Sequence, residues 1–393
     1  MYEKNNVAVA ILNGNLEEAH ELMKNGEQLS GQYVKNNTSR IFEILIDKNA
    51  IDLIDLLIVN DFIKTDIYEY DSFENSIFSS IAYLSNSGNV AIKFVNELLK
   101  RFKNINDEVN DQTLLGYCLM EGTDPAIIEE LIEGGCRVDY KNNANENFIY
   151  QVINEYRLSS ETGMHYLEIL TREGVDINQK NIAGVTPLML AAKKRKESYL
   201  EILLQNGASA NEQDNNGNNT FYYAVNEQSD YEALTKLLEY DSIDFDIQDK
   251  NGNNLFCEFL RMMENDDNQI KILEKLIEAG ANFEQSGSYY GNTKSGYDWL
   301  AEKKSSILEF ALKLNSLDLD FQDNLGNTLL HKVCSYDLNY DREAARELYK
   351  KTKVLLEAGA NPDITNNNNE TPLTLAQQDN LKIKTVELLM SNK

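Results

Sequence analysis

Residues 184–208 read GVTPLMLAAKKRKESYLEILLQNGA and contain two short apolar runs with the signals that begin and end helices. Thr186 is a favoured helix N-cap, and Pro187 suits the first helical position, where no backbone N–H is needed. Gly207 follows the second apolar run, as is typical of a glycine that ends a helix in a left-handed conformation. The stretch therefore predicts a unit of two helices joined by a turn.

The same pattern recurs from Asp111 to the C-terminus. Its beginning is repeated at Thr328-Leu329-Leu330-His331 and Thr371-Pro372-Leu373, and its end at residues 276–282 and 355–361. Aligned copies begin 33 to 43 residues apart, near Asp111, Asn145, Gly184, Gly217, Gly252, Thr293, Gly326 and Asn369. A base period of about 33 residues with occasional insertions indicates an array of one repeated supersecondary unit.

These motifs resemble those of the ankyrin repeat family. The resemblance implies an all-α solenoid of about eleven helix-turn-helix units, in which stacking of neighbours creates the core and no cofactor is required. We expect residues 111–393 to be ankyrin repeats. Residues 1–110 lack the Thr-Pro-Leu signature and are expected to be degenerate ankyrin-like repeats with a polar cap, continuous with the rest; a separate helical domain is the alternative.

Composition limits the classes of partner. The chain has 393 residues, with 64 Asp and Glu against 37 Lys and Arg, and a formal charge of −27. Such a charge argues against binding nucleic acid or an anionic membrane and favours a basic protein partner. No run approaches the roughly 18 apolar residues of a membrane span. The N-terminal segment does not resemble a signal peptide, so a cytoplasmic location is expected.

Catalytic and metal-binding patterns are weak. The three histidines, His20, His165 and His331, fall in different repeats, and no nucleophile–base set or metal-ligand spacing can be assembled around them. In ankyrin repeats a histidine at the position of His331 often ties neighbouring turns together, which is the role expected here. Of the four cysteines, Cys136 lies in a predicted turn and is expected to be the most exposed. We therefore predict no catalytic residue, no metal and no cofactor.

The candidate partner-binding residues come from one position of the repeat. By resemblance to the family, the residue before the small Ala position of the first helix faces a concave groove; in this sequence it is Tyr117, Gln151, Leu190, Tyr223, Glu258, Trp299, Lys332 or Leu375. Three of these are aromatic, and buried Tyr and Trp anchors dominate many interfaces. The alternative is that the rings pack between neighbouring helices, and the alignment at Trp299 is ambiguous by one residue.

Turns and insertions add further candidates. Asp214, Asp249 and Asp323 occupy the turn tips, and a Gly/Ser-rich insertion at residues 286–293, expected to be a loop, carries Tyr289 and Tyr290. A second insertion, residues 337–353, is expected to lengthen the second helix of its unit. Insertions into a regular scaffold are common places for function.

The resemblance implies a protein-binding scaffold without catalysis. Our sharpest hypothesis is an acidic bacterial inhibitor of the immunity type, monomeric when free, that occludes a basic toxin domain such as a nuclease. A bacterial effector that binds host proteins is the alternative. An enzyme with an unrecognised site in residues 1–110 is a third hypothesis, weakened because that segment has one His and no Cys.

Overall fold

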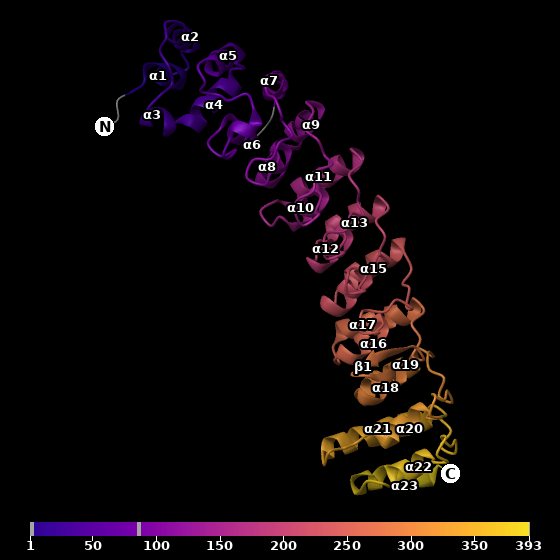
Figure 1. Ribbon diagram of the computed structural model, residues 1–393. Coiled ribbons are helices and arrows are strands. Elements are labelled where there is room, and N and C mark those ends of the chain that lie inside the picture. The colour runs from indigo at the N-terminus through magenta and orange to yellow at the C-terminus, as the bar shows by residue number, and fades with distance from the viewer. Residues whose placement is uncertain (1–3, 85–87, 393) are drawn as a thin grey trace. The chain divides into compact units, whose positions relative to one another are not determined.

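The computed structural model describes residues 4–84 and 88–392, which form an all-α repeat solenoid of eleven helix pairs (Figure 1). The first helices of the pairs are α1 (Asn6–Leu12), α4 (Thr38–Asp47), α6 (Ile77–Ala82), α8 (Leu114–Glu121), α10 (Phe148–Asn154), α12 (Pro187–Lys193), α14 (Thr220–Tyr222) with the π-helical turn η2 (Tyr223–Glu227), α16 (Leu255–Met262), α18 (Gly296–Glu302), α20 (Leu329–Ser335) and α22 (Pro372–Ala376). The second helices are α2 (Leu16–Lys24), α5 (Ile51–Val59), α7 (Asn89–Leu99), α9 (Pro125–Glu133), α11 (Ser160–Arg172), α13 (Glu197–Gln205), α15 (Tyr231–Tyr240), α17 (Asp267–Glu278), α19 (Ser305–Lys313), α21 (Arg342–Glu357) and α23 (Ile383–Ser391). Short helices α3 (Gln32–Lys35) and η1 (Ile67–Glu69) lie between pairs, and η3 (Asn380–Lys382) lies between the two helices of the last pair.

The chain divides into two compact units. Unit 1 comprises Met1–Ala191 and Lys196–Ala208, and unit 2 comprises Ala192–Arg195 and Ser209–Lys393. Within each unit the helices form two layers: α4 packs on α6 and α6 on α8 in unit 1, while α5 packs on α7 and α7 on α9. Unit 2 repeats this arrangement, with α16 on α18 and α18 on α20 in one layer and α19 on α21 and α21 on α23 in the other. Apolar residues from both layers form the core.

Buried polar side chains begin the first helices. From α8 onward, each N-cap side chain of a first helix accepts a hydrogen bond from the backbone N–H three residues on, as Thr113 does from Gly116 and Asn254 from Cys257. The same position is filled by Asn147, Thr186, Asn219, Ser295, Thr328 and Thr371. The recurring Thr of the repeat motif, and the Asn or Ser that replaces it, thus satisfies a helix N–H that burial would otherwise leave unpaired.

The turns before six of the first helices, α10, α12, α14, α16, α20 and α22, are each closed by a carboxylate or an amide. In the turn that starts at Asp214, Oδ1 accepts from the N–H groups of Asn216 (2.7 Å) and Asn218 (2.9 Å). The same two bonds recur at Asn142, Asn181, Asp249, Asp323 and Asn366. At the three predicted acidic turn tips, Asp214, Asp249 and Asp323, one carboxylate oxygen therefore accepts the hydrogen bonds that close the turn.

His331 connects two repeats, as expected. Its ring is fully buried, and Nδ1 accepts from the N–H of Thr328 at 3.2 Å. Nε2 lies 3.1 Å from the carbonyl oxygen of Glu370 in the next repeat and therefore carries the ring proton. Burial lowers the pKa of His331, which keeps the imidazole neutral in this position.

The insertion at residues 286–293 differs from the expectation. It is not an irregular loop but a β-hairpin, formed by β1 (Ser286–Tyr289) and β2 (Asn292–Ser295), with Ser286 paired to Ser295 and Tyr289 to Asn292. Its two-residue turn has positive φ at both Tyr290 (47°) and Gly291 (78°), the conformation that matches the twist of two antiparallel strands. The second insertion lengthens α21 to 16 residues, as predicted.

Cys136 was expected to be the most exposed thiol, and this expectation is wrong. All four cysteines are buried, and Cys136 is 4% exposed. Its backbone N–H bonds to the carbonyl of Leu131 at the end of α9, which draws the turn onto the core. Burial raises the pKa of the Cys136 thiol to about 12 and so disfavours the reactive thiolate.

Lysines of one repeat cap first helices of the preceding repeat. Lys382 Nζ donates to the carbonyl of Cys334 in α20 (2.9 Å), and Lys351 Nζ to that of Ala301 in α18 (2.5 Å). Lys303 donates to the carbonyls of Arg261 and Met263 at the end of α16, both at 2.8 Å. A cation at the C-terminal end of a helix interacts favourably with the helix dipole. Among the described residues, every helix is too short or too polar to cross a bilayer.

Gly217 lies where two adjacent turns approach each other closely, and its substitution tests this contact. It has φ +86°, and an added Cβ would lie 2.7 Å from Gln248 O and 2.8 Å from Asp249 Cα. Gly359 has a similar φ (+95°) with nothing within 4 Å. Gly359→Ala should cost about 1–2 kcal/mol for the backbone conformation alone, and Gly217→Ala about 2 kcal/mol more because backbone must move. Urea unfolding of both variants measures this difference, and equal losses would contradict it.

Lys351 should make stability depend on pH in the alkaline range. Burial lowers its pKa to about 8, below the ordinary value of about 10.4 in the unfolded chain. The unfolded state therefore binds more protons between these values, so the contribution of Lys351 to the free energy of unfolding rises with pH from about 8 to about 10.4. It falls again as the pH drops over the same range and is constant below it. The free energy of unfolding of the wild type, minus that of Lys351→Met, should increase by roughly 2–3 kcal/mol from pH 7.5 to 10.5. A constant difference would show that Lys351 keeps its ordinary pKa.

Candidate functional site

A cleft in unit 2 brings together four of the predicted residues. It encloses about 500 Å³ between the hairpin, the first helices α14 and α16 and the turn between them, and we call it the hairpin cleft. Its lining residues are Tyr222, Asp249, Asn251, Asn253, Glu258, Arg261, Ser288, Tyr289, Tyr290 and Gly291. Side chains from consecutive repeats thus face one space.

The hairpin is held against the preceding turn by its backbone. The N–H of Ser288 donates to the carbonyl of Gly252 at 3.0 Å. A Cβ on Gly287 would lie 3.1 Å from Asn253 Cα, so glycine at this position permits the close approach. The hairpin therefore forms a fixed wall of the cleft.

Aromatic rings cover this wall. Tyr289 meets Trp299 edge to face, with ring centroids 4.9 Å apart and an interplanar angle of 85°. Tyr290 meets Tyr289 in the same way at 4.7 Å, and its side chain is 89% exposed. Trp299 is 6% exposed and supports Tyr289 from behind, so Tyr290 presents the largest free aromatic surface of this cluster.

Cations already lie over these rings. Lys294 Nζ is 4.2 Å from the centroid of Trp299 and 5.3 Å from that of Tyr289. Arg261 lies 5.8 Å from the centroid of Tyr289 and pairs with Glu258, whose Oε2 is 2.9 Å from Arg261 Nε. The positions show that the rings accept lysine and guanidinium groups on their faces.

The two carboxylates that line the cleft, Asp249 and Glu258, already form hydrogen bonds within the protein. Asp249 closes its turn through Oδ1, and Oδ2 accepts from Asn251 Nδ2 at 3.2 Å. The Glu258 side chain is 16% exposed. Both carboxylates are held in place by the protein, and each keeps lone pairs for a further donor.

The remaining predicted residues lie outside the cleft and are mostly buried. Tyr223 is 3% exposed, and its hydroxyl donates to Oδ2 of buried Asp214 at 2.5 Å. Lys193 covers the Tyr223 ring at 5.0 Å from the centroid. Tyr117 and Leu190 belong to unit 1 and are each 6% exposed. For Tyr117, Tyr223 and Trp299 the structure has the packing arrangement that the sequence left as the alternative, and partner contact by any of these residues stays a prediction.

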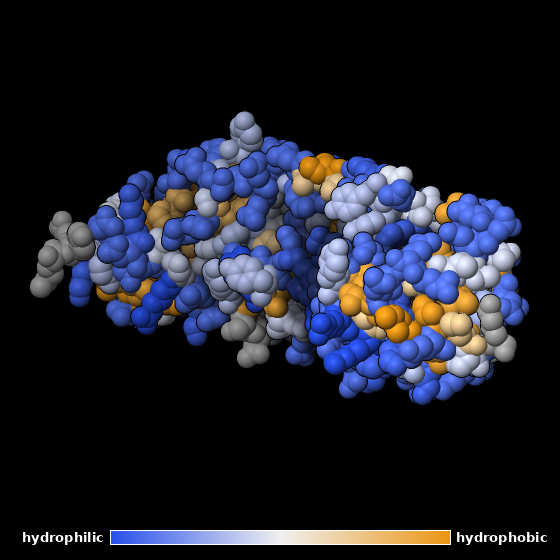
Figure 2. Space-filling model, turned by 90° about the horizontal axis from the view of Figure 1, so that it is seen from below, coloured by the Kyte–Doolittle hydropathy of each residue, from blue (hydrophilic) through white to orange (hydrophobic). Residues whose placement is uncertain are grey.

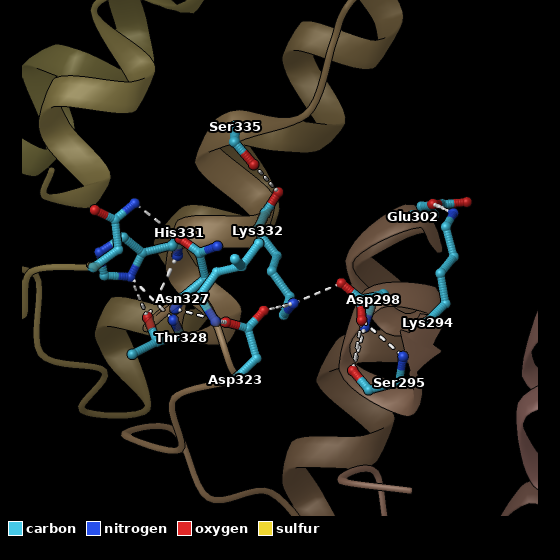
Figure 3. Close-up of polar contacts among 12 residues, drawn as sticks. Lys294, Ser295, Asp298, Glu302, Asp323, Asn327, Thr328, His331, Lys332 and Ser335 are labelled. Carbon is cyan, nitrogen blue, oxygen red and sulfur yellow. Dashed lines mark hydrogen bonds and ion pairs between the residues drawn. The ribbon is translucent and has the colours of Figure 1, made fainter. Parts of the chain in front are cut away.

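Asp323 belongs to an ion network that joins two repeats (Figure 3). Lys332 Nζ lies 2.5 Å from Asp323 Oδ2 and 2.6 Å from Asp298 Oδ1. Asp298 in turn accepts from the N–H and hydroxyl of Ser295, both at 2.7 Å. Burial alone would raise the pKa of Asp323, but hydrogen bonds from Lys332 and the turn N–H groups hold it below its usual value. This carboxylate is therefore a structural anion.

Sequence reasoning missed several residues in and beside the hairpin cleft, among them Tyr222, Lys294 and Arg261. Tyr222 lies one residue before the predicted position at Tyr223, and Lys294 lies within the hairpin, which was expected to be a loop. Arg261 could have been found, because it follows Glu258 by three residues on a helix and such pairs face each other. No local sequence pattern indicated that the rings of Tyr117, Tyr223 and Trp299 are buried.

A metal site would require several His, Cys, Asp or Glu side chains close together. Within residues 4–84 and 88–392, no cluster of three or more His, Cys, Asp and Glu side chains is placed to hold a metal ion. His20 lies in a separate cleft of about 670 Å³ in unit 1, beside Glu17, Glu21 and Asp52. The described lining of that cleft includes no Ser, Thr, Cys or Lys to act as a nucleophile.

Comparison with known proteins identifies the repeat. The family model described as ankyrin repeats (3 copies) matches residues 158–251. The ankyrin repeat domain-containing protein OPG023 of cowpox virus (strain Brighton Red) is 27% identical over 198 residues, 49% of this chain and 29% of that protein. The chain therefore contains ankyrin repeats.

The chain is also similar to an avian protein and to one solved structure. The nuclear factor NF-kappa-B p105 subunit of Gallus gallus is 29% identical over 191 residues, 48% of this chain and 18% of that protein. The crystal structure of the ankyrin repeat domain of Bcl-3 aligns with a TM-score of 0.48 and 18% identity, and covers 60% of this chain and 96% of that domain. This ankyrin-repeat chain thus spans less than a third of the length of either curated relative.

Trp299 and Tyr290 should behave oppositely on truncation. Trp299→Ala removes a buried ring between the hairpin and α18 and should cost about 3–5 kcal/mol of stability. Tyr290→Ala removes an exposed ring and should change stability by less than about 0.5 kcal/mol. Denaturant unfolding followed by far-UV circular dichroism measures both values. A small loss for Trp299→Ala would mean that this ring does not support the fold.

Proposed function

We propose that this ankyrin-repeat chain is a non-enzymatic scaffold that grips a basic segment of a protein partner in the hairpin cleft and thereby occludes it. The observation that carries the proposal is the exposed Tyr290 ring, fixed beside Tyr289 and facing the same cleft as Asp249 and Glu258. Aromatic faces and carboxylates together suit an arginine or lysine side chain.

The mechanism that we propose is occlusion by a preformed surface. The hairpin wall is held by backbone hydrogen bonds, so a partner meets a site that needs little ordering. The net charge of −27 steers basic proteins toward the chain and raises their association rate, an effect that salt weakens. We infer a partner whose function depends on the basic surface that is covered.

The finer proposal is an inhibitor of the immunity type, with a toxin domain such as a nuclease as its partner. It is supported by the acidic charge and by the scaffold alone. Neither of the curated relatives described above is named as an immunity protein; one is viral and the other avian. A bacterial source and an intracellular site of action therefore stay predictions.

A second candidate follows from those relatives. One of them is a protein of cowpox virus, whose name records an ankyrin repeat domain. Its occurrence in a virus favours the hypothesis that the chain binds proteins of an infected or invaded host. The hairpin cleft serves this function in the same way, with a basic host segment as occupant.

Binding of a basic probe to paired tyrosine variants tests the cleft. The probe is a fluorescein-labelled peptide of arginines separated by glycines, followed by fluorescence anisotropy. Tyr290→Ala should weaken binding about tenfold or more, because an aromatic anchor contributes about 1.4–2 kcal/mol. Tyr340, which is 95% exposed and also has a positive φ, lies outside the cleft and provides the matched control Tyr340→Ala.

The outcomes separate a specific site from general attraction. Unchanged affinity in Tyr340→Ala, with the loss confined to Tyr290→Ala, supports the cleft. Equal affinities for both variants and the wild type would mean that the peptide is held by overall charge. That result would remove the hairpin cleft as the binding site.

A further inference from the structure

A second surface in unit 2 has the opposite electrostatic character. A groove of about 530 Å³ runs between α21 and the segment formed by η3 and α23. Its lining residues, which define what we call the α21 groove, are Arg342, Ala345, Arg346, Tyr349 and Lys350 from α21 together with Leu381 and Lys384. None of them lines the hairpin cleft.

The α21 groove exists because α21 is long. The helix has 16 residues, whereas the neighbouring second helices α19 and α23 have nine each. The lining positions 342, 345, 346, 349 and 350 follow a three-to-four-residue spacing and so lie on one face of α21. The insertion that lengthens this helix therefore supplies most of the groove.

Four cations surround the α21 groove in an otherwise acidic chain. Residues 342–393 carry eight Lys and Arg against seven Asp and Glu, a net charge of +1. Residues 1–341 carry the remaining 29 basic and 57 acidic residues, a net charge of −28, and the two parts sum to −27. All the net negative charge of the chain thus lies before α21.

These cations remain available to a ligand. Arg346, Lys350 and Lys384 pair with Glu343, Glu347 and Glu387 three residues away, at 2.6, 2.6 and 2.7 Å. The cationic side chains are 59–78% exposed, and exposed pairs of this kind contribute only about 0–1 kcal/mol. The three glutamates do not line the groove, so a carboxylate placed within it meets the cations first.

The floor of the α21 groove is apolar. Ala345, Tyr349 and Leu381 are half-buried there and offer hydrocarbon and an aromatic ring to an occupant. Figure 2, which views the molecule from below and so from the side of α22 and α23, shows apolar residues gathered among polar ones at this end of the chain. Cations around an apolar floor complement a segment that has acidic residues beside an apolar face.

We propose that the α21 groove binds an acidic amphipathic segment of a protein partner, with apolar side chains on the floor and carboxylates on Arg342, Arg346, Lys350 and Lys384. Arginine binds carboxylates through two parallel hydrogen bonds, and a helix laid in a groove is a common mode of peptide recognition. A polynucleotide fits less well, because phosphates gain nothing from the apolar floor and the rest of the chain repels an extended polyanion. The scaffold would then hold a basic segment at one surface and an acidic segment at another.

The test uses peptide probes and charge-reversal variants of the full chain. The main probe is a fluorescein-labelled peptide of about twelve residues, with leucines along one helical face and glutamates elsewhere. The second replaces the leucines with serines at the same charge, and the third is a single-stranded oligodeoxynucleotide of similar length. The groove variant is Arg346→Glu with Lys384→Glu, and the matched control is Lys313→Glu with Lys353→Glu, two exposed lysines outside the groove.

We expect the leucine peptide to bind the wild type and to bind the groove variant about tenfold or more weakly, with the control variant within about twofold of the wild type. The serine peptide should bind at least about tenfold more weakly than the leucine peptide, since it cannot use the floor. Equal binding of the serine peptide or of the oligonucleotide, equal losses in the two variants, or no binding of the leucine peptide would each overturn the proposal. Thermal melting of each variant confirms that it is folded, and the basic peptide of the preceding test, whose loss of affinity on Tyr290→Ala is measured in each background, reports separately on the hairpin cleft.

Discussion

The structure depends on the fact that one helix pair cannot bury its own apolar face. A pair such as α16 and α17 presents apolar residues on both sides, and only the neighbouring pairs remove them from water. Close stacking in turn requires that the backbone ends of buried helices find partners. The side chains at Asp249 and Asn254 meet this need by closing the turn and capping the helix that follows.

This requirement explains how much the sequence could predict. The capping and turn residues act locally, so motifs such as Thr186-Pro187-Leu188 identified the repeat, the helix pairs and their approximate number. The role of His331 was also accessible, because family resemblance assigns it to the turn. Residues whose environment is set by their own neighbours in the chain were the predictable ones.

The candidate site was predicted less completely, because it depends on contacts between repeats. Tyr223 occupies the expected position of its helix, but Asp214 and Lys193 cover the ring from the turn and from the end of α12. Trp299 is covered by the hairpin. A Gly/Ser-rich segment within an all-α array does not by itself predict such a hairpin. Asp249, Glu258, Tyr289 and Tyr290 do meet, through a fold of the insertion that no local pattern indicated. Both proposed surfaces arise where an insertion departs from the regular repeat.

The lysine caps have a consequence for synthesis of the chain. Lys351 and Lys382 contact carbonyls of α18 and α20 that precede them by 50 and 48 residues. A chain emerging from the ribosome therefore exposes the end of each of these helices before the lysine that covers it has been made. Because folding during synthesis proceeds from the N-terminus, the newest of these repeats stays incomplete until the next one has emerged, and its final order lags translation by about one repeat.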